Sequence, residues 1–116
     1  MATQYVGSGT FVANTTITAY LGVVLSNNRG VGLSTTTAID AIALVDGASG
    51  DYVSVAFLTN NGTLKGTITA VPVTVGDTLF LGATGLLSTT GTVTVGKALT
   101  TATSNGSVIE FIPKNV

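Results

Sequence analysis

Two carboxylates that flank a short turn form the best candidate metal site in the sequence. Asp46 and Asp51 enclose the four turn residues 47–50. With backbone carbonyl groups of the turn, the pair could hold one hard cation such as Ca²⁺. The other interpretation is that both side chains lie where strands end and accept hydrogen bonds from turn N–H groups. We favour the second interpretation, and expect no metal site and no other cofactor.

Residues that could perform catalysis are scarce. The chain has no histidine and no cysteine, so the commonest general base and the thiolate nucleophile are both missing. A serine nucleophile would need Lys65 or Lys97 as its base, and the sequence contains no Ser-x-x-Lys motif. The glycines form no phosphate-binding loop that leads into a helix. We therefore expect no catalytic residues and no enzymatic activity.

The first 16 residues hold the candidate partner-binding residues. Residues 1–16 are small and polar and show little strand pattern, which predicts an extended N-terminal arm. Within this arm, Tyr5, Val6, Phe11 and Val12 have the most apolar area with which to bind a partner. The alternative is that the arm pairs with the protein's own sheet.

The composition excludes several classes of partner. Only 8% of the 116 residues are charged, against about 25% in a typical protein, and the net charge is −1. Nucleic-acid binding, which depends on clustered Lys and Arg, is therefore not expected. Apolar runs such as residues 41–45 are far shorter than the roughly 20 residues of a membrane span. No signal peptide is visible, so we expect synthesis in the cytoplasm. Low charge also suits a chain that stays docked in an assembly.

The elements that carry these residues are predicted to be short strands. Apolar and polar residues alternate in short runs that glycine, asparagine and aspartate interrupt, for example at Asn61-Gly62 and Asn105-Gly106. This pattern is typical of an all-β protein, a compact β-barrel or sandwich. The predicted strands are 17–26, 31–34, 39–45, 52–59, 67–73, 78–81, 86–88, 92–99 and 107–112.

An internal repeat supports the strand assignment. The tetrapeptide Leu-Ser-Thr-Thr at 33–36 recurs at 87–90, and residues 50–55 fall on 106–111. The Ala-rich stretch 37–45 could be drawn as a helix, but its counterpart at 92–95 reads Thr-Val-Thr-Val, so we predict a strand for both. The predicted organisation is an arm, 1–16, and a single β domain, 17–116. The domain contains two related β units at roughly 19–58 and 76–112, although chance similarity in so Thr-rich a chain is the alternative.

The second half of the chain resembles a known family. Val-Gly-Asp-Thr-Leu-Phe-Leu at 75–81, Gly-Leu-Leu-Ser at 85–88, Val-Gly-Lys-Ala-Leu at 95–99 and Ser-Val-Ile-Glu-Phe at 107–111 are similar to a pattern in small capsid decoration (cement) proteins of tailed bacteriophages. The resemblance covers roughly residues 17–112.

This resemblance implies a structural virion protein without catalytic activity. It implies a place on the outer capsid surface, where the protein bridges subunits of the major capsid protein, and self-association that is commonly trimeric. The alternative is a carbohydrate-binding or adhesin-type β module of a phage fibre or baseplate. For that alternative the candidate stacking residues are Tyr5, Tyr20 and Tyr52, and the chain has no Trp to join them.

Overall fold

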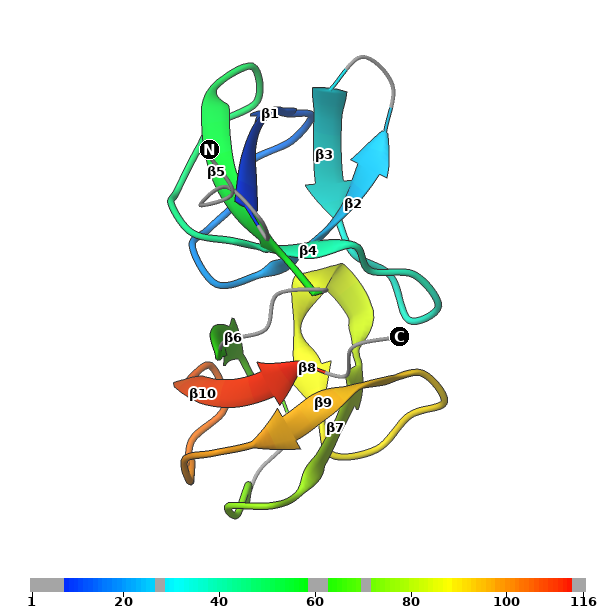
Figure 1. The fold of residues 1–116 in the computed structure, drawn as a ribbon, viewed down its shortest axis with the longest axis vertical. Coiled ribbons are helices and arrows are strands. Elements are labelled where there is room, and N and C mark those ends of the chain that lie inside the picture. The colour runs from blue at the N-terminus through cyan, green and yellow to red at the C-terminus, as the bar shows by residue number, and fades with distance from the viewer. Residues whose placement is uncertain (1–7, 27–28, 59–62, 70–71, 114–116) are drawn as a thin grey trace, which may run out of the picture.

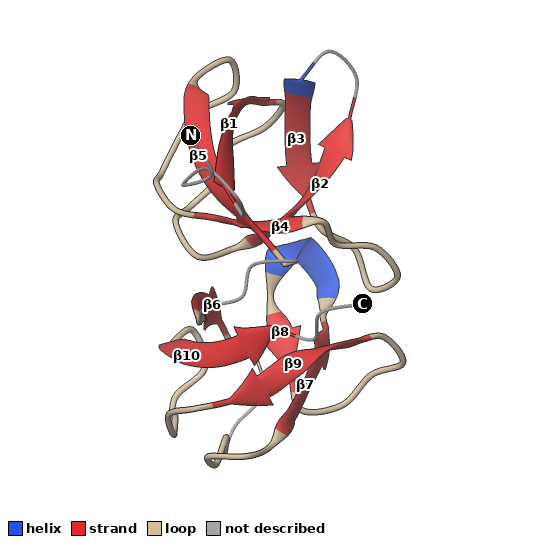
Figure 2. Cartoon of the chain, in the orientation of Figure 1, coloured by secondary structure: helices blue, strands red, loops and turns tan. Residues whose placement is uncertain are grey.

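A computed structural model of the chain describes residues 8–26, 29–58, 63–69 and 72–113. Two β units are stacked along the long axis of the molecule (Figure 1). The N-terminal unit contains β1 (Ser8–Ala13), β2 (Gly22–Ser26), β3 (Gly30–Leu33), β4 (Ala41–Ala43) and β5 (Tyr52–Phe57). The C-terminal unit contains β6 (Leu64–Thr67), β7 (Thr78–Leu81), the 3-10 turn η2 (Ala83–Gly85), β8 (Leu87–Ser88), β9 (Thr94–Ala98) and β10 (Val108–Pro113). Figure 2 shows strands in both units, with short helical turns before β3 and β8.

The two units share one strand-pairing scheme. The N-terminal unit is a closed barrel with the order β1-β3-β2-β4-β5, in which β5 returns to pair with β1. The C-terminal sheet has the order β6-β10-β9-β7-β8, and a parallel bridge between Ile68 and Leu87 brings its two edge strands together. The predicted all-β fold is therefore confirmed. In the described ranges, no helix is long and apolar enough to cross a bilayer.

Matching hydrogen bonds show how closely the units correspond. The Gly50 amide donates to the Ala13 carbonyl at 2.8 Å, and the Gly106 amide donates to the Ile68 carbonyl at 2.7 Å. The bridge between Ile17 and Gly47 likewise has a counterpart between Val73 and Ala102. Equivalent residues lie 55 or 56 positions apart. The backbone hydrogen bonds and strand pairs of each residue therefore identify its counterpart in the other unit.

Four tight turns set where strands begin. Gly50, Gly76 and Gly106 have φ values of 94°, 93° and 85°, and Tyr20 has 69°. Each is the third residue of a turn in which the fourth residue donates its N–H to the carbonyl of the first, as in the 3.0 Å bond from Asp77 to Thr74. Positive φ at this position is the signature of a type II turn and favours glycine.

The hydrophobic core forms two clusters. One lines the N-terminal barrel. The other fills the C-terminal unit and also includes Ile42 and Ala56, which belong to β4 and β5 of the N-terminal unit. The two units therefore share buried apolar surface and do not form separate cores.

The predicted arm is wrong for the part of it that the structure describes. Residues 8–13 form β1, which pairs antiparallel with β5 from Ser8 to Val12 and runs parallel to β3. The reason is that pairing with strands on both sides holds this segment in the β conformation, although its sequence shows little strand pattern. Residues 1–7 lie outside the described part of the chain.

Two further expectations on strands need correction. Residues 67–73 were expected to form one strand, whereas β6 covers Leu64–Thr67. The tetrapeptides at 33–36 and 87–90 are not equivalent, because Leu87 pairs with Leu81 as Val31 pairs with Leu25. The strand prediction for the Ala-rich segment is confirmed by β4.

Candidate functional site

The two carboxylates of the candidate metal site accept hydrogen bonds from the backbone. Asp46 accepts a bond of 2.7 Å from the Ala19 amide, and Asp51 accepts one of 3.0 Å from the Ala48 amide. These bonds match the interpretation of the pair as turn residues. Among the residues that the structure describes, no group of three or more His, Cys, Asp or Glu side chains could hold a metal ion.

The other three carboxylates are also engaged in the fold. Asp77 accepts from the Thr74 amide at 2.9 Å, as Asp51 does in the equivalent turn type. Asp40 accepts from the Leu25 amide at 2.8 Å, where β2 has no strand partner on that side. Glu110 accepts from the Thr63 hydroxyl at 2.7 Å. Each acidic side chain of the protein thus has a visible structural task.

Three described basic side chains lie far apart on the molecule. The Arg29 guanidinium donates to the Thr10 carbonyl at 2.7 Å and lies 4.8 Å from the centre of the Phe11 ring. The Lys65 ammonium lies 5.7 Å from the centre of the Tyr20 ring. Lys97 is exposed on β9. They make no basic patch of the kind that binds a phosphate backbone.

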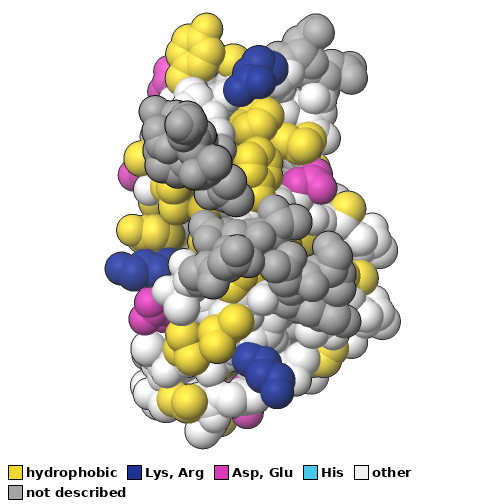
Figure 3. Space-filling view, in the orientation of Figure 1, with side chains coloured by type: hydrophobic (Ala, Val, Ile, Leu, Met, Phe, Trp, Pro, Cys, Tyr) yellow, Lys and Arg dark blue, Asp and Glu magenta, His cyan; other side chains and the backbone are white. Residues whose placement is uncertain are grey.

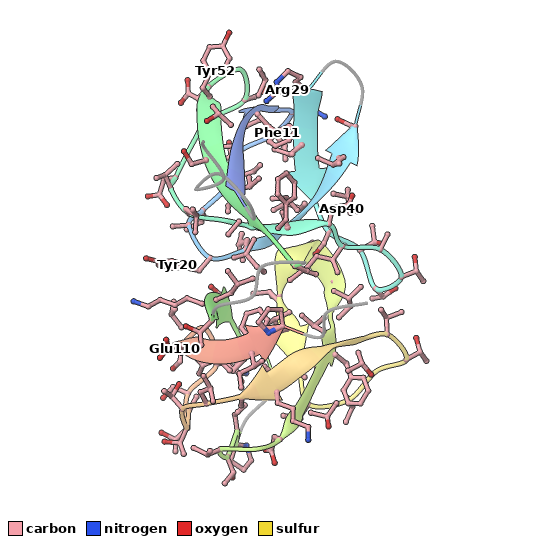
Figure 4. The ribbon with its side chains drawn as sticks, in the orientation of Figure 1. Phe11, Tyr20, Arg29, Asp40, Tyr52 and Glu110 are labelled. Atoms are coloured by element: carbon pink, nitrogen blue, oxygen red, sulfur yellow. The ribbon has the colours of Figure 1, made fainter. Side chains whose placement is uncertain are left out.

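The structure places the predicted partner-binding residues in different settings. Phe11 packs edge-on against Phe57 with ring centres 5.8 Å apart and contacts the N-terminal core cluster. Its neighbour Val12 is half-buried on the other side of β1. Figure 4 shows the Phe11 ring between β1 and β3, close to Arg29. Phe11 therefore contributes to the barrel itself, whereas Tyr5 and Val6 lie outside the described residues.

The tyrosines do not form a stacking platform within the described chain. Tyr20 lies near the junction of the units and Tyr52 lies at the far end of the N-terminal unit (Figure 4). Tyr52 is 77% exposed. Tyr5 lies outside the described residues. Two rings so far apart cannot stack on the same sugar.

Exposed apolar side chains are the most distinctive surface feature of the described chain. They are spread over both units, and Figure 3 shows them as separate groups on the face in view. The set consists of Leu25, Leu44, Val45, Tyr52, Val75, Val108 and Ile112. Leu25 lies on β2 and Ile112 on β10, and the sequence of a strand alone cannot say which of its outward positions stay uncovered.

A shallow depression of about 510 Å³ lies on the C-terminal unit. Three strands, β7, β9 and β10, supply its lining, which is mainly apolar. The lining residues are Thr78, Thr94, Gly96, Lys97, Ile112 and Pro113. Its polar side chains are the hydroxyl groups of Thr78 and Thr94 and the ammonium group of Lys97. Sequence reasoning did not single out this surface.

Comparison with known proteins shows a similarity in fold. No protein-family model and no curated protein matches the sequence. Among solved structures, the fold is similar to that of the N base of the head fibre protein gp8.5 of bacteriophage phi29. The TM-score is 0.76 and the sequence identity is 20%, over 93% of this chain and 93% of that chain. The chain therefore has the fold of a phage head-fibre base.

Proposed function

We propose that this protein is a structural component of a phage virion. In this proposal it attaches to the outer surface of the head and bridges subunits of the major capsid protein. The observation that carries the proposal is the fold shared over 93% of both chains with a protein named for a fibre on a phage head. The resemblance of short motifs in the second half of the chain to capsid decoration proteins motivates the bridging part of the proposal, although no family model matches the sequence.

The surface of the described chain supports a binding role without catalysis. All five carboxylates accept hydrogen bonds within the fold. Several large apolar side chains are exposed, with Tyr52 at 77% and Val75 at 57%. A surface with few charges and scattered apolar residues suits permanent contact with another protein.

The second candidate function is the base of a fibre. The name of the phi29 protein favours it, since that structure is described as the N base of a head fibre. In this case the protein would bind the head with one surface and carry further protein on another. The two candidates share attachment to the head and differ in what lies beyond it.

Adding the purified protein back to phage heads tests the proposal. Heads prepared from the phage that encodes the chain, with its gene deleted, are mixed with the protein and sedimented. We expect saturable co-sedimentation, and cryo-electron microscopy should show ordered density that touches at least two capsid subunits. The mock control is the same protein mixed with heads of an unrelated phage.

The outcomes separate the candidates. Density that ends at the protein, together with heads that withstand higher temperature after addition, supports bridging. Density that continues outward in wild-type particles supports the fibre base. The absence of saturable binding to the deleted heads contradicts both.

A further inference from the structure

One of the asparagine–glycine pairs of the sequence lies in a described turn at the surface. Asn105 and Gly106 are the middle residues of the turn 104–107, in the loop that joins β9 to β10 (Figure 1). Both residues are exposed. Asparagine is a chemically labile residue, and a following glycine leaves its own amide nitrogen unshielded because it has no side chain. The pair Asn61-Gly62 lies outside the described residues.

The reaction open to such a pair is deamidation. The Gly106 backbone nitrogen loses its proton and attacks Cγ of the Asn105 side chain, which forms a cyclic imide. The bond from Cγ to the side-chain nitrogen breaks, and that nitrogen leaves with the proton as ammonia. Water then opens the ring at either carbonyl group and leaves aspartate or isoaspartate at position 105. Solvent water is the sole co-reactant, so an exposed turn supplies everything that the reaction needs.

The fold engages the nitrogen that must attack. The Gly106 amide donates a hydrogen bond of 2.7 Å to the Ile68 carbonyl. Loss of the amide proton would leave a negatively charged nitrogen against the carbonyl oxygen, so the hydrogen bond must break first. The nitrogen of the cyclic imide carries no hydrogen, so the ring and this hydrogen bond cannot exist together.

Ile68 ties this turn to the rest of the C-terminal sheet. Its own amide donates to the Ser107 carbonyl at 3.0 Å, so Ile68 holds the turn by hydrogen bonds in both directions. Ile68 is fully buried and forms the parallel bridge with Leu87 that brings the edge strands of the sheet together. We therefore expect the Gly106 amide to be released only when this part of the sheet opens.

The equivalent turn of the N-terminal unit has the same hydrogen bond without the reactive side chain. The Gly50 amide donates to the Ala13 carbonyl at 2.8 Å. Ser49 stands at the position of Asn105, and a serine side chain has no carbonyl carbon for the glycine nitrogen to attack. The turn therefore does not need asparagine to form, and the labile residue is a property of the C-terminal turn.

We propose that Asn105 is a deamidation site that the hydrogen bond from Gly106 to Ile68 controls. The site is protected as long as the bond is made, and it reacts as in an unfolded chain once this part of the sheet has opened. Isoaspartate adds one atom to the main chain inside the turn, so the hydrogen bonds to Ile68 cannot re-form with their original geometry. The modification thus marks each molecule whose C-terminal unit has opened. The proposal does not depend on attachment to a phage head.

The test compares two reactions that require the same proton to leave the Gly106 amide. Hydrogen exchange, followed by NMR, gives the protection of this amide as the ratio of its exchange rate in the unfolded chain to that in the folded protein. Deamidation is measured at the same mildly alkaline pH by mass spectrometry, in the folded protein and in guanidinium chloride. The tryptic peptide 98–114 contains Asn105 as its one asparagine and has no glutamine, so its gain in mass reports this site alone.

We expect deamidation to be slower by about tenfold or more in the folded protein, and to be slowed by the same factor as hydrogen exchange, within about tenfold. Phe111→Ala leaves a cavity in the core of the C-terminal unit and should accelerate both reactions together. Asn105→Ser is the matched control, because it copies the equivalent turn of the N-terminal unit. It should abolish the reaction at this site and leave exchange of the Gly106 amide unchanged.

The effect of the product is measured on deamidated protein separated by ion-exchange chromatography. The isoaspartate form should melt at a lower temperature than Asn105→Asp, which carries the new charge without the extra main-chain atom. Equal melting temperatures would overturn the assignment of the damage to the lengthened turn.

The control by the hydrogen bond is overturned by any of three results. The first is deamidation of the folded protein at the rate seen in guanidinium chloride. The second is a slowing of deamidation that differs from the protection of the Gly106 amide by more than about tenfold. The third is a Phe111→Ala protein in which exchange of this amide accelerates and deamidation does not. The comparison of both rates in the unchanged protein decides the proposal even if this variant fails to fold.

Discussion

In the N-terminal unit, β1 carries Phe11 and β5 carries Val55, whereas the equivalent positions in the C-terminal unit hold Gly66 and Phe111. The aromatic ring has moved from one strand of the pair to the other. A Cβ on Gly66 would lie 2.6 Å from Leu87 Cδ1 and 3.2 Å from Phe111 Cε1. The comparison teaches that one pairing scheme tolerates different side chains as long as the volume inside the barrel is conserved.

The ends of the two units are covered by different means. Ile42 and Ala56 of the N-terminal unit are buried in the cluster that fills the C-terminal unit. In the N-terminal unit itself, Phe11 packs against Phe57 and beneath Arg29, while Leu25 stays 47% exposed. Stacking one unit on another therefore completes a core that a single unit leaves open.

Deleting residues 2–12 should lower the stability of the protein more than any other change described below. The deletion removes most of β1, and with it the pairs that close the N-terminal barrel against β5. It also removes Phe11, whose partly buried ring should contribute roughly 1–3 kcal/mol by itself. We expect the N-terminal unit to unfold, as measured by circular dichroism and by a fall in melting temperature.

Deletion of residues 2–7 is the matched control for this experiment, because it leaves every described pair of β1 in place. A protein without residues 2–12 that melts like the full chain would show that the barrel is stable without β1. That result would restore the view of this segment as an arm.

Truncating Phe111 should have the next largest effect. Phe111→Ala leaves a cavity in the cluster shared by both units and should cost roughly 3–5 kcal/mol. Val55→Ala, at the equivalent position, removes fewer buried methyl groups and should cost roughly 1–3 kcal/mol. Urea unfolding measures both values.

Tyrosine fluorescence tests whether the two units unfold together. All three tyrosines precede residue 53, so their fluorescence follows the N-terminal half. In Phe111→Ala it should change together with circular dichroism. Separate transitions would contradict a shared core.

The sequence predicted the strands of strong alternation and missed those that depend on a partner. The predicted strand 78–81 matches β7, and 52–59 contains β5. β1 was missed because its residues are small and show little strand pattern, whereas the strand is held by its pairing with β5 and β3. The start of β6 was misplaced because Gly66 reads as a strand breaker, although the nearby Leu87 and Phe111 leave no room for a side chain there.

The candidate surfaces were less predictable than the strands. Leu25 and Leu81 both end short continuous apolar runs, and nothing local distinguishes the 47% exposed residue from the 2% exposed one. The difference arises from the stacking of the units, which is a tertiary property. The turn role of Asp51, by contrast, follows from local sequence, because its carboxylate accepts a bond from Ala48 three residues before it.

Substituting Gly85 should have a smaller effect than truncating Phe111. Gly85 has a φ of 82°, and a Cβ there would lie 2.8 Å from the Gly22 carbonyl oxygen in the other unit. Gly85→Ala should therefore cost roughly 2–3 kcal/mol. Gly50→Ala is the control, since its φ of 94° is similar but no atom lies within 4 Å of the added Cβ. It should cost about 1 kcal/mol. Equal losses would show that the contact between the units contributes little to stability.

The smallest expected effect concerns a feature that the two units share. Asp51 and Asp77 each accept a hydrogen bond from the first amide of their turn, at 3.0 and 2.9 Å. Because these bonds lie near the surface, Asp51→Ala and Asp77→Ala should each cost roughly 0.5–1.5 kcal/mol. The two losses should agree within about 0.5 kcal/mol, and the double variant should show their sum, since the turns share no partner. Asp→Asn at either position should retain most of the stability, because the amide oxygen can accept the same bond. Urea unfolding of the single, double and Asn variants measures all of these values. A much larger loss for one aspartate would mean that the two equivalent turns do not contribute equally to stability.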